Sequence, residues 1–154
     1  MKTRTVRVLL LSIVLAAVLL SPALSNIGWA KNRINVVVKT VLASGGEKYL
    51  DPRLSALIEE LHTLFRYSSY RLLSEDHLQL DIKQTGRVSL PGRRTLKIKP
   101  IAVADNRIEL RLVIQRKKEQ VFQTVIQLLN HGSIIVGGPK HKDGSLLFSI
   151  SASY

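Results

Sequence analysis

The side chains most often used in catalysis and metal binding are present in this sequence, but their spacing does not build a site. The four histidines, His62, His77, His131 and His141, show no ligand spacing such as HxH or HExxH, and the chain has no cysteine. A metal ion would need ligands that converge from distant segments. No G-x-S-x-G elbow accompanies the serines. We therefore expect no metal, no cofactor and no catalytic residue, in a protein that is not an enzyme.

One short run could still suggest acid–base chemistry. Ser74, Glu75, Asp76 and His77 are consecutive, and the simpler interpretation is a polar turn between two strands. An enzyme with an unrecognised site is kept as a second alternative. A deep cleft with acids near His77 or His131 would indicate it.

Basic side chains follow a clearer pattern. Five of them fall on two neighbouring predicted strands whose other faces are apolar: Arg93, Lys97, Lys99, Arg107 and Arg111. If the strands pair, these cations merge into a patch that could bind the charges of a polyanion without reading its sequence. The alternative is an ordinary solvated face that discourages edge-to-edge aggregation.

A glycine pair between two apolar runs marks the C-terminal segment "LNHGSIIVGGPKHKDGSLLFSI", residues 129–150. It is not a phosphate loop, because five residues separate Gly138 from Gly144, no lysine precedes the serine, and a strand follows. A hairpin accounts for it: the glycines allow unusual backbone angles, Pro139 ends a strand, and Asp143-Gly144 forms the turn. As an assembly surface, the same segment offers an interaction loop of Gly137, Gly138, Pro139, Lys140 and Lys142.

The stretch "GSIIVGGPKHKDGSLLFSI" resembles the strand–Gly-Gly–strand segment of the secretin family, the ring-forming outer-membrane channels of secretion and pilus systems. The preceding "KKEQVFQTVIQLL" is similar to the strand that enters this segment, so the resemblance covers about 35 residues. The chain is too short for a secretin's channel, and Pro139 and a basic tip replace the usual continuation. The resemblance implies envelope assembly with a protein partner and does not imply channel formation.

The N-terminus has the layout of a secretory signal peptide. Lys2, Arg4 and Arg7 precede the apolar run Val8–Leu20, and small residues end at Ala30. We expect residues 1–30 to be removed, after Ala30 or at the alternative site Ser25, and residues 31–154 to form one small domain. We expect the protein to be exported, and we favour the periplasm over extracellular release as its location. Without cysteines, the domain must fold without disulfides.

The net charge of the chain limits the classes of partner that we expect. The chain has 23 Lys and Arg, three of them in residues 1–30, against 11 Asp and Glu, which leaves +9 for residues 31–154. This favours anionic lipid or polysaccharide. Nucleic acid is not expected, because an exported protein meets little of it and the aromatic residues of "FRYSSYR", residues 65–71, fit a helix–strand junction. Nothing in the sequence determines the oligomeric state.

The periodicities predict one helix and a series of strands. "DPRLSALIEELHTLF" has Asp51 as N-cap, Pro52 at the first helical position and an apolar stripe on one face. The stripe contains Leu54, Leu57, Ile58, Leu61, Leu64 and Phe65. Strands are predicted at Ile34–Leu42, Ser69–Leu73, His77–Lys83, Arg94–Val103, Arg107–Gln115, Gln120–Leu129, Ser133–Val136 and Ser145–Ala152.

These elements predict an α+β fold: one amphipathic helix of about 14 residues packed on a mainly antiparallel, curved sheet of six to eight short strands. The leading functional hypothesis is an exported, noncatalytic envelope protein that acts as a binding or assembly module of a secretion or pilus system. The alternative is a cationic binding module for an anionic envelope polymer or lipid.

Overall fold

The computed structural model describes residues 33–154, which belong to one compact unit, Lys31–Tyr154. The predicted signal peptide therefore lies outside the described residues. The helices are η1, a 3-10 helix (Pro52–Leu57), and α2 (Ile58–Leu64). The strands are β1 (Ile34–Ser44), β2 (Tyr49–Leu50), β3 (Ser69–Leu80), β4 (Gly86–Leu90), β5 (Arg94–Ala104), β6 (Arg107–Arg116), β7 (Glu119–Leu129), β8 (Gly132–His141) and β9 (Gly144–Ser153).

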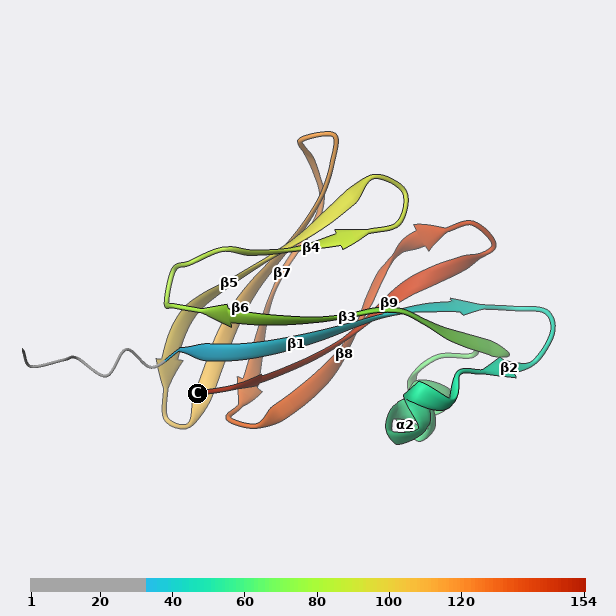
Figure 1. Cartoon of the computed structure of the whole chain (residues 1–154), viewed down its shortest axis with the longest axis horizontal. Coiled ribbons are helices and arrows are strands. Elements are labelled where there is room, and N and C mark those ends of the chain that lie inside the picture. The colour runs from blue at the N-terminus through green and yellow to red at the C-terminus, as the bar shows by residue number, and fades with distance from the viewer. Residues whose placement is uncertain (1–32) are drawn as a thin grey trace, which may run out of the picture. The chain divides into compact units, whose positions relative to one another are not determined.

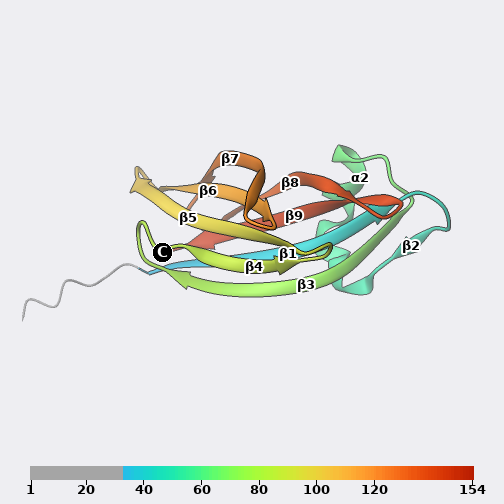
Figure 2. The ribbon, with the colours of Figure 1, turned by 90° about the horizontal axis from the view of Figure 1, so that it is seen from above.

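The described strands form two curved sheets (Figures 1 and 2). Sheet A has the order β2-β3-β1-β9-β8, and sheet B has the order β4-β5-β6-β7. Every neighbouring pair is antiparallel except β2–β3. No ladder joins β3 to β4 or β7 to β8 within residues 33–154, so each sheet keeps two edges. The predicted α+β class with mainly antiparallel, curved pairing is confirmed, but the described residues form nine strands in two sheets, where one sheet of about six to eight strands was predicted.

The main core lies between the two sheets. In β6, the alternate residues Ile108, Leu110, Leu112 and Ile114 are each at most 1 % exposed, as the sequence predicts. Buried side chains from β1, β3, β4, β5, β7 and β9 complete the cluster, and partly buried side chains of β8 pack against it. Each such burial stabilises the fold by roughly 1.5–3 kcal/mol before conformational entropy is counted. Sheet B therefore has one buried face and one solvated face.

A second core lies on the other face of sheet A, under the helices. Leu54 and Leu61 pack there with Val41, Tyr70 and Leu147. In both views α2 and β2 lie at the right-hand end of the molecule, which strands β5, β6 and β7 do not reach (Figures 1 and 2). The predicted single α-helix is in fact a 3-10 helix followed by a short α-helix. The tighter 3-10 turn shifts the apolar stripe, and Leu64, predicted to be buried, is 54 % exposed.

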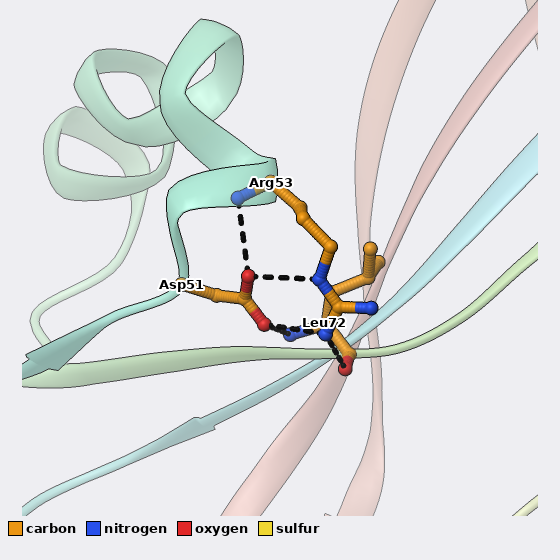
Figure 3. A network of polar contacts seen from close by, with 3 residues as sticks. All are labelled: Asp51, Arg53 and Leu72. Atoms are coloured by element: carbon orange, nitrogen blue, oxygen red, sulfur yellow. Dashed lines mark hydrogen bonds and ion pairs between the residues drawn. The ribbon is translucent and has the colours of Figure 1, made fainter.

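The start of the helices is held by one carboxylate (Figure 3). Asp51 Oδ1 accepts hydrogen bonds from the backbone N–H of Arg53 (3.1 Å) and its Nε (3.0 Å). Oδ2 accepts from Arg53 Nη2 (2.8 Å) and from the backbone N–H of Leu72 in β3 (3.2 Å). The Arg53 guanidinium holds the pKa of the Asp51 carboxyl well below its usual range. The predicted N-cap is confirmed, and it also ties the helices to sheet A.

The sequence predicts a polar turn at Ser74-Glu75-Asp76, and this prediction is wrong. β3 runs unbroken from Ser69 to Leu80 and pairs with β1 along its length. Thr40 is opposite Ser74 while Val41 is opposite Leu72, so Leu73 has no opposite residue and forms a bulge. The strand can carry these polar residues because the Ser74 hydroxyl donates to Asp76 Oδ2 (2.8 Å) and Lys39 Nζ lies 3.7 Å from Glu75 Oε2.

Candidate functional site

The outward face of sheet B brings four cations together from three strands. Arg87 of β4 is directly opposite Lys97 of β5, and Lys99 of β5 is directly opposite Arg111 of β6. Directly opposed residues in an antiparallel pair have Cβ atoms about 4.5–5.5 Å apart, and like charges in these positions are destabilising. We call Arg87, Lys97, Lys99 and Arg111 the cationic patch.

The described part of the chain does not neutralise the cationic patch. None of the ion pairs within residues 33–154 involves its four side chains. The nearest acid on the outward face of β6 is Glu109, which is opposite Ala102 on one side and Gln127 on the other. Arg87 and Arg111 are exposed, and Lys97 and Lys99 are half-buried. The arrangement can therefore hold an external anion across three strands.

Two of the predicted anion-binding residues lie apart from the cationic patch. Arg107 is opposite Ala104 at the far end of the β5–β6 pair, where its Nη1 donates to Gln127 Oε1 (3.2 Å). Arg93 was predicted to be a strand residue, which is wrong: it lies in the β4–β5 turn with a φ of 57°, and the strand begins at Arg94.

Arg87 was missed from the sequence because Gly86–Leu90 was not assigned as a strand. The short-range sequence pattern would have been enough to predict this strand. Val88 and Leu90 alternate with Arg87 and Ser89 just before the turn residues Pro91 and Gly92, and Val88 is 1 % and Leu90 6 % exposed. An alternating run that ends at Pro-Gly is a strand entering a hairpin.

The predicted interaction loop lies inside strand β8. β8 and β9 form an antiparallel hairpin, as predicted, but Pro139 does not end the strand, because pairing resumes at Lys140 opposite Ser145 after a register shift. Neither Gly137 nor Gly138 has a positive φ, so unusual backbone angles are not the reason for the pair. A Cβ at Gly138 would collide with the ring of Phe148, so close packing requires that glycine.

The hairpin turn is also shifted by one residue from its prediction. Lys142 and Asp143 make the turn, with a φ of 52° at Lys142, and Gly144 already belongs to β9. Beside this turn is a hollow of about 360 Å³ lined by Tyr67, Lys140, Lys142, Asp143, Gly144 and Ser145. The Tyr67 hydroxyl donates to Ser145 Oγ (3.0 Å). Two ammonium groups there are partly balanced by the Asp143 carboxylate.

The acid–base candidates do not converge. His77 Nε2 lies 3.3 Å from Glu75 Oε1 on an open strand face, and the His77 side chain is 69 % exposed. His131 borders a hollow of about 180 Å³ whose other lining residues contain no acid: Asn35, Val37, Ser151, Ala152 and Ser153. Within residues 33–154, no three His, Asp or Glu side chains gather as a metal site would need. No helix in that range has the length and apolar character needed to cross a membrane.

Comparisons with known proteins returned no match: no family model, no curated protein and no solved structure. The resemblance of residues 117–150 to the secretin segment stays a prediction. In the structure this stretch corresponds to β7, β8 and β9, with the glycine pair at the β8 bulge.

Proposed function

We propose that this protein is an exported, noncatalytic binding module of the cell envelope, and that the outward face of sheet B holds an anionic polymer or lipid. The observation that carries the proposal is the pair of directly opposed like charges, Arg87–Lys97 and Lys99–Arg111, with no acid paired to them within residues 33–154. A face under no functional demand would gain stability from any acid at these positions. Export and the envelope rest on the N-terminal pattern.

The spread of the cationic patch across the open face of sheet B fits an extended ligand. The four side chains of the cationic patch spread over three strands, with neighbouring strands about 4.8 Å apart. A lipid headgroup layer or a charged polymer presents anions over such distances, whereas a small metabolite would need an enclosing cleft. Each cation near an anionic surface contributes about 1 kcal/mol.

Binding to two probes tests the proposal: vesicles that contain phosphatidylglycerol, and soluble dextran sulfate. Wild type should bind one or both, with an affinity that falls as salt is raised. Reversing two charges, Lys97→Glu with Arg111→Glu, should weaken binding about 1,000-fold, because each reversal removes one attraction and adds one repulsion of about 1 kcal/mol. Preference for vesicles or for polymer identifies the source of the anion.

A matched control separates the patch from net charge. Lys48 and Arg66 are exposed residues near the helices, and Lys48→Glu with Arg66→Glu makes the same change in net charge away from sheet B. This control should change affinity less than 10-fold. Equal losses in the two double variants would mean that only net charge matters, and the proposed site would be wrong.

The second candidate function is assembly with an envelope protein, as in a secretion or pilus system. The secretin-like segment and the unpaired strand edges favour it. Crosslinking of the mature protein in intact envelopes tests it. Recovery of secretion or pilus components that withstands high salt would support assembly, and recovery of lipid or polysaccharide alone would count against it.

A further inference from the structure

Strand edges present unpaired backbone N–H and C=O groups, and stable proteins usually blunt them with short strands, charges, proline or bulges. Most edges of the two sheets follow this rule. β2 has two residues, and β4 has five and carries Arg87. The edge of β8 is interrupted by the bulge that contains Pro139. Beyond β2, the edge of β3 carries the charged residues Arg71, Glu75 and Asp76.

β7 is the exception. It is 11 residues long and pairs only with β6 among the described strands. From Gln120 to Leu129 it contains no charge, no proline and no glycine. It also carries three of the seven large hydrophobic side chains that are exposed within residues 33–154: Val121 at 50 %, Val125 at 44 % and Leu129 at 57 %. An edge of this length and composition readily pairs with another strand.

The outward side chains of β7 are self-complementary. They read Val121, Gln123, Val125, Gln127 and Leu129. If a second β7 runs antiparallel with Val125 opposite itself, Val121 meets Leu129 and Gln123 meets Gln127. Apolar residues then face apolar residues and amides face amides, and no charge opposes a like charge.

We infer that two copies of this chain pair through β7, antiparallel and centred on Val125, so that their B sheets join into one sheet of eight strands. The two-fold axis of such a pair is perpendicular to the sheet, which leaves both outward faces on the same side. The inference rests on the edge and its pattern and stands independently of the proposed anion binding.

The pairing would also combine the two cationic patches. Arg111 is directly opposite Val125 on one side and Lys99 on the other. One transverse row of the joined sheet would therefore read Lys99, Arg111, Val125 and then the same residues in reverse from the second copy. The two Arg111 positions would be about 14 Å apart, three strand spacings. That exceeds the Debye length of about 8 Å at physiological salt, so the patches would repel each other weakly.

Cysteine crosslinking tests the register directly, because the chain has no cysteine of its own. Val125→Cys should form a disulfide-linked dimer on mild oxidation, since residues opposed across an antiparallel pair have Cα atoms at a distance a disulfide spans. The matched control is Val113→Cys, on the same face of β6 but one strand inward from the edge, and it should crosslink at least 10-fold less. Val121→Cys mixed with Leu129→Cys should give more heterodimer than either gives homodimer.

Sedimentation of unmodified and charged variants completes the test. Wild type should sediment as a dimer at 100 μM, and Val125→Lys, which places two ammonium groups against each other, should sediment as a monomer. Val113→Lys adds the same charge and should remain a dimer. Circular dichroism checks that each variant folds. The inference is overturned if wild type is monomeric, or if Val125→Cys crosslinks no better than Val113→Cys, including the case in which β7 pairs with a different protein.

Discussion

On the solvated face of sheet A a lysine is directly opposite an acid, whereas on the solvated face of sheet B cations are directly opposite cations. On sheet A, Lys39 of β1 is directly opposite Glu75 of β3, with 3.7 Å between Nζ and Oε2, and Glu75 also lies 3.3 Å from His77 Nε2. On sheet B, Arg87 is opposite Lys97 and Lys99 is opposite Arg111. Both strand pairs lie within residues 33–154 and share the same net charge. The general basicity of the chain therefore does not explain the difference.

The contrast between the two sheets indicates which face would bind a ligand. Sheet A follows the arrangement that stabilises an antiparallel pair, with opposite charges facing each other. Sheet B departs from it at two successive outward positions of β5, Lys97 and Lys99. A departure that lowers stability and exposes charge is most simply explained by a partner that supplies the missing acids. Sheet A serves as the internal reference for what an ordinary solvated face looks like.

The largest expected effect on stability concerns Asp51, whose bonds hold the helices over sheet A. Asp51→Ala removes the N-cap and leaves the Leu72 N–H unpaired, and it should lower the Tm by roughly 5–10 °C. Polyanion binding by sheet B should be unchanged at temperatures where the variant is folded. Thermal unfolding and vesicle binding of the same sample check this. A matching loss of affinity would show that the two regions are not independent.

The same carboxyl gives a pH dependence. Its pKa is lowered in the folded state from the ordinary Asp value of 3.8, so protonation disfavours the fold. The stabilisation is present above about pH 4 and is lost as the pH falls further. Asp51→Asn keeps a capping side chain but cannot titrate, so its Tm should fall less than that of wild type between pH 5 and pH 2. Parallel Tm curves for the two proteins would contradict the assigned role.

A smaller effect is expected when sheet A is made to resemble sheet B. Glu75→Lys places two lysines opposite each other on β1 and β3 and should lower the stability by about 0.5 kcal/mol. Denaturant unfolding measures the change. Glu75→Gln, which removes the ion pair without adding a like charge, should lie between wild type and Glu75→Lys. If Glu75→Lys were as stable as wild type, opposed like charges on sheet B would carry no information about function.

Local sequence patterns predicted which face of each element is buried. They predicted less well which elements lie side by side. The alternation of β6 places Ile108 and Ile114 in the core, and Asp51 with Pro52 marks the start of the helices, because side-chain periodicity and capping depend on adjacent residues. The division into two sheets could not be predicted, since it depends on where ladders between distant strands stop. Continuity of β3 was missed because a bulge at Leu73 interrupts its alternation.

The candidate site was predicted in part for the same reason. Lys97, Lys99 and Arg111 lie on outward positions that alternation identifies, and the pairing of β5 with β6 joins them as expected. Arg87 belongs to the cationic patch only because the β4–β5 register places it opposite Lys97, and the sequence alone did not predict that register. Arg93 was misplaced because a left-handed φ at a non-glycine turn residue leaves little trace in the sequence. Gly138 was singled out for its backbone freedom, whereas glycine is required there by the ring of Phe148, which lies on another strand.

The most direct test of the account is a paired measurement on one variant, Arg111→Glu, of unfolding free energy and of affinity for anionic vesicles. The substitution turns the Lys99–Arg111 pair into an opposite-charge pair like that of Lys39 and Glu75 on sheet A. We expect the two quantities to change in opposite directions: the unfolding free energy should rise by about 0.5 kcal/mol, while the affinity should fall about 30-fold. A variant that loses stability, or one that binds as tightly as wild type, would contradict the claim that the like charges are kept for an anionic partner.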